Sequence, residues 1–168
     1  ISAGQRAAPG AIERVRIDPA TLEPRVKVIG CDLWSIDPGF AAATAATGVT
    51  GICGSGIIEL VAELYLAGVI RSDGVIDGDL SVRNPRVHAD GRTFSYRLHD
   101  GGDGRATLRL TQNDVRAIQL AKAALYAAHG VRPGAIQGGT IRGQVGRVTL
   151  GERVDIGLLL GTDVGTPV

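Results

Sequence analysis

Four glycines crowd the stretch Thr47–Glu59, directly before a run of residues with helical spacing. Gly48, Gly51, Gly54 and Gly56 fall within nine residues. Glycine lets the backbone turn tightly and approach a ligand closely. A helix that begins after such a turn presents unpaired N–H groups, where an anion can bind. The spacing is neither that of the phosphate loop with its lysine nor that of the dinucleotide fingerprint. Two interpretations are open: an anion site, or a tight strand-to-helix turn without a ligand.

Other residue types that could do chemistry are sparse. Cys31 and Cys53 are the two cysteines of the chain, too few for an iron–sulfur cluster or a structural zinc site. The histidines His88, His99 and His129 show no ligand spacing to one another or to the cysteines. We therefore expect two reduced thiols and no metal, which disfavours a redox or metal protein.

Composition narrows the class of protein further. The chain has 168 residues, enough for one domain with a core, and with 4% aromatic residues that core must consist of Ala, Val, Ile and Leu. A formal net charge of +1 gives no argument for nucleic acid or an anionic membrane as a partner. No apolar run is long enough to cross a bilayer and no secretory signal is present, so we expect a cytoplasmic location. The chain begins at Ile1 and contains no methionine, and we expect it to be a piece of a longer polypeptide.

Alternating apolar residues predict two β-hairpins. The first lies within the first thirty residues, with strands around Val15–Ile17 and Arg25–Gly30. The second pairs residues 92–98 with residues 107–111 across a Gly-rich turn. The segment from Arg71 to Arg86 contains Asp-Gly and Asn-Pro pairs and is predicted to be loop.

Helical spacing predicts two longer helices. The first runs from Ile57 to Leu66 and is ended by Gly68. The second runs from Val115 to Ala128 after a capping-box pattern, a threonine followed three residues later by an acid. Its small residues would let it pack close to a sheet: Ala117, Ala121 and Ala124. The stretch Ala41–Ala46 is either a short helix or a loop.

Three segments in this order carry a family resemblance: Ala3–Glu13, Thr50–Glu59 and Thr111–Ala124. Together they resemble the ferredoxin-fused, ATP-dependent reductive activators of corrinoid proteins. The C-terminal region of that family has the fold shared by actin, sugar kinases and heat-shock chaperones (ASKHA). The resemblance implies an α/β fold with α+β features, in which residues 1–128 form part of the second ATPase lobe as a mixed sheet with packed helices. Residues 129–168 form a divergent Gly-rich tail that we cannot align.

The resemblance also implies a function. Family members use ATP to drive the reduction of a Co(II) corrinoid protein to the methyl-accepting Co(I) state, in the service of a methyltransferase. Their [2Fe–2S] ligands and Asp-x-Gly-Thr phosphate motifs lie upstream of the matching region. The implied ligand is ATP with Mg, bound weakly or not at all by this piece alone, and the implied partners are a corrinoid protein and a possible second copy. No catalytic residue can be named, and enzymatic activity stays open. The alternative is a non-catalytic docking or regulatory module that binds a corrinoid or partner protein.

Six residues are candidates for the nucleotide site. Gly54, Ser55 and Gly56 are either a nucleotide-proximal turn or a purely structural one. Lys122 either reaches the adenosine side of the cleft or is a solvated lysine. In relatives, a strand ends in a Gly-rich loop that meets the adenosine, and Gly138 with Gly139 is the candidate equivalent here.

Overall fold

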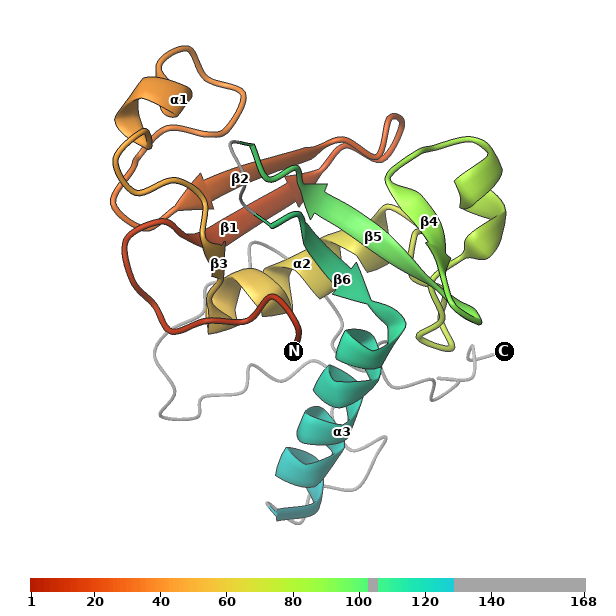
Figure 1. The fold of residues 1–168 in the computed structure, drawn as a ribbon. Helices are drawn as coiled ribbons and strands as arrows, with labels where there is room; N and C mark the ends of the chain where they lie inside the picture. The colour runs from red at the N-terminus through yellow and green to blue at the C-terminus, as the bar shows by residue number, and fades with distance from the viewer. Residues whose placement is uncertain (103–105, 129–168) are drawn as a thin grey trace, which may run out of the picture.

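The protein has two small β-sheets and three α-helices in the part of the chain described by the structure, a computed structural model that covers residues 1–102 and 106–128 (Figure 1). The elements in chain order are β1 (Ala11–Ile17), β2 (Pro24–Val28), α1 (Phe40–Ala43), β3 (Gly51–Ile52), α2 (Gly54–Leu66), the 3-10 helix η1 (Gly78–Val82), β4 (Val87–Asp90), β5 (Thr93–His99), β6 (Leu108–Thr111) and α3 (Gln112–Ala128).

The first sheet is mixed and has the order β2-β1-β3. Strands β1 and β2 form the predicted antiparallel hairpin, with Val15 opposite Val26. Strand β3 lies parallel to β1 over two residue pairs, Ala11 with Gly51 and Ile12 with Ile52. The first hairpin and the mixed sheet of the sequence prediction are confirmed.

The second sheet is an antiparallel meander in the order β4-β5-β6. The predicted hairpin is its β5–β6 pair, in which Tyr96 lies opposite Leu110. Its third strand, β4, was not predicted, and neither was η1 within the expected loop. Both are short, and neither shows a clear alternation in the sequence.

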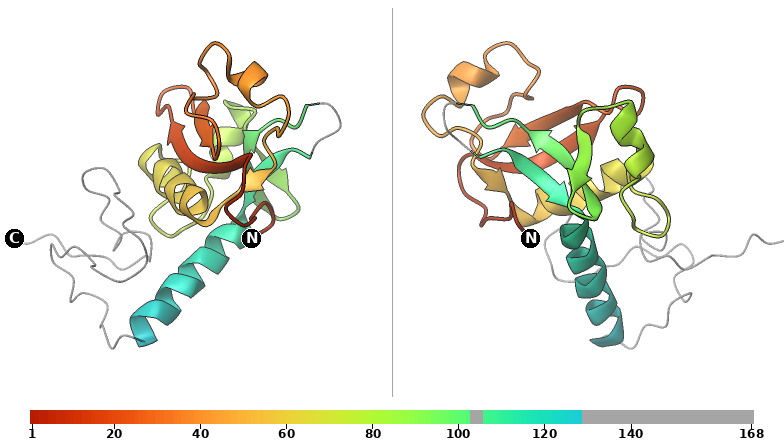
Figure 2. Two further views of the ribbon diagram at one scale, coloured as in Figure 1. Left: turned by 90° about the vertical axis from the view of Figure 1, so that its left-hand side faces the viewer. Right: turned by 45° about the vertical axis from the view of Figure 1, so that its right-hand side comes forward.

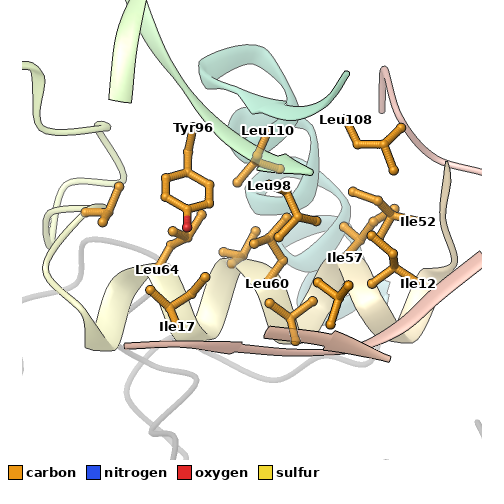
Figure 3. Close-up of a cluster of buried hydrophobic side chains, with 14 of the residues drawn as sticks. Ile12, Ile17, Ile52, Ile57, Leu60, Leu64, Tyr96, Leu98, Leu108 and Leu110 are labelled. Carbon is orange, nitrogen blue, oxygen red and sulfur yellow. The ribbon is translucent and has the colours of Figure 1, made fainter. Parts of the chain in front are cut away.

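Helix α2 packs against β1, and its inner side chains join those of both sheets in one core (Figure 3). Leu60 and Leu64 are fully buried on its inner side, in the same core cluster as Ile12 of β1 and Tyr96 of β5. Burying such a side chain contributes about 1.5–3 kcal/mol. The helix begins three residues earlier than predicted, and Gly68 follows it with a φ of 74°, the left-handed conformation expected of a C-terminal cap.

Two glutamates of α2 close the open edge of β1. Beyond Ile12, β1 has no strand on the side of β3, and the N–H groups of Val15 and Ile17 donate instead to carboxylates. Glu59 accepts from Val15 at 2.7 Å, and Glu63 accepts from Ile17 at 3.0 Å. Both glutamates thus satisfy N–H groups of β1 that no strand of the described residues bonds.

Arginines surround the Glu59 carboxylate. Arg14 Nε lies 3.1 Å from Glu59 Oε2, and Arg16 Nη1 also donates to Glu59. Burial raises the pKa of the Glu59 carboxyl, but the hydrogen bonds from Arg16, Val15 and Arg14 outweigh burial and leave this pKa below its ordinary value of 4.5.

A buried hydrogen bond joins the turn of the first hairpin to the second sheet. The hydroxyl of Tyr96 donates to the carbonyl of Leu22 at 2.7 Å, and both residues are buried. Leu22 has a φ of 58°, a left-handed conformation that costs a non-glycine residue roughly 1–2 kcal/mol. Arg86 Nε adds an ion pair with Glu23 Oε1 at 2.9 Å on the exposed side of the same joint.

Helix α3 leaves the body of the fold (Figures 1 and 2). Its predicted capping box is confirmed, since Asp114 N donates to Thr111 Oγ1 at 3.2 Å and Thr111 N donates to Asp114 Oδ2 at 2.9 Å. Val115 is buried and Ile118 packs against the core, so the first two turns of the helix contact the body of the fold. The prediction that the small residues pack against a sheet is wrong, because these residues are exposed: Ala117, Ala121 and Ala124.

Replacing Tyr96 with phenylalanine tests the joint between the sheets. The buried Leu22 carbonyl would lose its donor, and the free energy of unfolding should fall by about 1–3 kcal/mol. Urea denaturation followed by circular dichroism measures this change. An unchanged transition midpoint would show that the bond does not stabilise the joint.

The Glu59→Gln variant tests the edge of β1. It should lower the free energy of unfolding at pH 7 by about 1.5–3 kcal/mol, because two arginines lose their carboxylate. Because the pKa of Glu59 is lower in the folded state, its carboxylate stabilises the fold fully above pH 4.5. This stabilisation is lost as the pH falls through the folded-state pKa. Wild type and variant should therefore converge in acid. Glu13→Gln, on the same strand, is the control, and a difference that stays constant down to pH 3 would contradict this account.

Candidate functional site

The Gly-rich turn connects β3 directly to α2. Cys53 occupies the N-cap position with extended backbone angles, φ −79° and ψ 170°, and no side chain caps the helix. Gly54 and Ser55 are exposed. The first N–H groups of a helix have no acceptor within the helix, so this turn presents backbone donors to solvent at the positive end of the helix dipole.

The two glycines of the turn differ in what surrounds them. A Cβ atom at Gly56 would lie 2.3 Å from the carbonyl oxygen of Ile12, so α2 can approach β1 this closely only with glycine there. A Cβ atom at Gly54 would meet nothing within 4 Å. Packing therefore explains Gly56, whereas the space beside Gly54 is open to a ligand.

The side chains at the turn offer little chemistry of their own. Cys53 Sγ lies 3.1 Å from Ser55 Oγ, and Cys53 is buried. Both cysteines are free, and the described residues contain no group of three His, Cys, Asp or Glu side chains that could hold a metal ion. Over residues 1–102 and 106–128, no helix combines the length and apolar character needed to cross a membrane.

Of the other candidate site residues, only Lys122 lies within the described part of the chain. Lys122 is half-buried on α3, which runs away from the body, whereas α2 begins beside β3 (Figures 1 and 2). The structure does not bring Lys122 together with the turn. Gly138 and Gly139 lie outside the described residues.

A shallow hollow of about 380 Å³ lies between the residues just before the turn and residues near the start of β6. It is lined by Thr47, Val49, Thr50, Ala106 and Leu108. None of the three turn residues lines it, so the hollow and the exposed end of α2 are separate features.

The first five residues form a strap along β3 that the sequence did not reveal. Ile52 N donates to the carbonyl of Ala3 at 2.9 Å, and Gln5 N donates to the carbonyl of Ile52 at 2.9 Å. At its other end, Ser2 donates to Asp114 from both its N–H and its hydroxyl, each at 2.7 Å. Sequence reasoning assigned Asp114 to the helix cap alone, since nothing local connects residues so far apart.

Comparison with known proteins assigns the chain to a family. The sequence model described as the C-terminal domain of RACo, the ASKHA domain, matches residues 1–136. The chain belongs to this family. The fold class expected from the sequence is confirmed as ASKHA-like, with its two small sheets and packed helices.

Two relatives within the ASKHA family carry functional names. The corrinoid activation enzyme RamQ of Eubacterium limosum is 32% identical over 133 residues, which cover 75% of this chain and 20% of RamQ. A solved structure of a reductive activator for corrinoid, iron-sulfur protein matches with a TM-score of 0.52 and 30% identity, over 80% of this chain and 20% of that one. The chain thus spans about a fifth of the length of each relative, and the resemblance to corrinoid activators is confirmed.

The two glycines of the turn should respond oppositely to alanine. Gly56→Ala should lower the free energy of unfolding by about 1–3 kcal/mol, because its methyl group overlaps the backbone of Ile12. Gly54→Ala should leave stability unchanged or raise it by up to about 1 kcal/mol, since alanine favours the helix and meets no atom. Thermal and urea denaturation of both variants measure this, and equal effects would contradict the packing explanation.

Proposed function

We propose that this chain forms one side of the nucleotide site in an ATP-dependent activator that drives reduction of a Co(II) corrinoid protein to Co(I). Membership of the ASKHA family supports ATP as the ligand, and the names of both relatives support a corrinoid protein as the partner. The chain matches a fifth of each relative, and in this proposal it acts as one section of a larger activator.

The observation that carries the proposal is the open space at Gly54. A glycine at the start of a helix weakens the helix, and here the fold does not require it. The exposed N–H groups of Gly54 and Ser55 would bind a phosphate group of ATP through hydrogen bonds to a charged acceptor, in a field that favours anions. Gly56 would contribute by letting α2 pack close to β1, which fixes where those donors point.

The remaining residues of the proposed site are assigned from the family resemblance alone. Lys122, Gly138 and Gly139 are assigned to the adenosine side of the cleft, and a second copy of the chain is a proposed partner. No Mg ligand is assigned among the described residues. A [2Fe–2S] cluster takes four ligands, and Cys31 with Cys53 does not fit it, so no electron-transfer step is assigned to these residues.

Photoaffinity labelling tests ATP binding without requiring high affinity. The full chain is irradiated with an ATP analogue that carries an azide on the γ-phosphate, and labelled peptides are mapped by mass spectrometry. We expect label on the peptide that contains Gly54 and Ser55, protected by ATP or tripolyphosphate and not by adenosine. Weak overall labelling is expected because relatives provide further phosphate-binding motifs.

A matched pair of variants makes the test specific. Gly54→Val keeps the backbone N–H but fills the open space beside it, so the phosphate can no longer approach that donor. ATP-protectable labelling should fall by about tenfold, as for a hydrogen bond to a charged group that can no longer form. Gly102→Val is the control, since Gly102 also has open space around its Cβ position and follows β5 rather than β3. Labelling that ATP does not protect, or that both variants reduce equally, would contradict the proposal and favour a docking module without a nucleotide.

A further inference from the structure

The strap of residues Ile1–Gln5 runs between β3 and the base of α3. Its C-terminal half lies along β3, and Gly4 forms a parallel bridge with Ile52. Its N-terminal half reaches the base of α3, beside which the chain terminus lies in Figures 1 and 2. The strap therefore joins the strand that leads into the Gly-rich turn to the first turn of α3.

Strand β3 pairs with β1 along one edge and with the strap along the other. It contains two residues and pairs with β1 at two positions. On its other edge, the N–H and carbonyl of Ile52 bond to Ala3 and Gln5 of the strap. Gln5 also donates from Nε2 to Thr50 Oγ1 at 2.9 Å, just before the strand. Movement of the strap would thus free one edge of the residue that immediately precedes Cys53.

The strap also lies close to the first turn of α2. A Cβ atom at Gly4 would lie 3.5 Å from the Cδ1 atom of Ile57, so the strap passes beside the first turn of α2 with space between them for no more than a methyl group. Ala3 packs against the hydrophobic core. The strap is thus bonded to the strand and lies close to the helix that flank the turn.

A single buried carboxylate holds the far end of the strap. Asp114 accepts from Ser2 N through Oδ1 and from Ser2 Oγ through Oδ2, and it accepts from Thr111 N and Thr111 Oγ1 through Oδ2. Asp114 is 5% exposed, so its bonds are little weakened by water. The same carboxylate caps α3 and anchors the strap.

From these contacts we infer that Ser2 and Asp114 are positioning residues for the Gly-rich turn. They act through the strap, which fixes β3 and the first turn of α2 and so sets the direction of the N–H groups of Gly54 and Ser55. Phosphate binding at the turn is thereby linked to the base of α3. The part of this inference that concerns phosphate rests on the proposed function, and the part that concerns the geometry of the turn does not.

Two variants separate the strap from the helix cap. Ser2→Ala removes the hydroxyl bond to Asp114 and leaves the cap of α3 intact. Thr111→Val removes the hydroxyl that bonds to Asp114 in the cap and leaves both bonds from Ser2. Asp114→Asn weakens both sets of bonds and serves as the stronger variant.

Amide hydrogen exchange, resolved by residue with NMR on the full chain, gives the first readout. Ser2→Ala should accelerate exchange about tenfold at Gln5, Ile52 and Cys53, whose N–H groups are hydrogen-bonded in the structure, the factor expected for loss of one charge-assisted hydrogen bond. Thr111→Val should accelerate exchange at the start of α3 and not at the turn. Unchanged exchange at Ile52 and Cys53 in Ser2→Ala, or equal acceleration of all amides by both variants, would overturn the inference.

Titration of the same samples with tripolyphosphate and with adenosine gives the second readout, which a purely structural role would not move. Ser2→Ala should weaken tripolyphosphate binding about tenfold and leave adenosine binding unchanged. Equal tripolyphosphate affinity in wild type and Ser2→Ala would overturn the positioning role while the proposed function stands. If the wild type binds no tripolyphosphate, the proposed function fails, and the exchange comparison alone decides whether the strap fixes the turn.

Discussion

The close approach of α2 to β1 is the contact on which the rest of the structure depends. Gly56 allows it, because any side chain there would overlap the carbonyl of Ile12. At that short separation Glu59 can reach the backbone of Val15 and close the edge of β1. The inner side of α2 is then buried between the two sheets, and the outer end of the helix is left facing solvent at Gly54.

The elements with strong local patterns could be predicted from the sequence. Alternation in residues 92–98 predicted β5, and the spacing from Ile57 to Leu66 predicted α2, since each pattern reports one buried face. Contacts between distant residues could not be predicted, because no local periodicity encodes them. The strap that joins Ser2 to Asp114 and the carboxylates that replace a strand beside β1 both belong to this class.

The sequence predicted where the candidate site lies, but it did not predict the role of each residue in it. The sequence grouped Gly54, Ser55 and Gly56 as one Gly-rich turn, and spacing alone could not separate glycines needed for packing from glycines that leave room. Only the surroundings of each Cβ position distinguish Gly56 from Gly54. The geometry of the turn does not identify a ligand. Membership of the ASKHA family gives the reason to expect ATP there.

The direction of α3 is set by polar groups that are buried at its base. Gln112 accepts from Ile76 N and donates to the carbonyl of Gly74, each at 2.8 Å, while Asp114 binds the strap. Buried polar groups are costly unless their hydrogen bonds form, and those bonds form in one orientation. With these bonds and the packing of Val115 and Ile118, the base of the helix is fixed, and Ala117, Ala121 and Ala124 remain exposed.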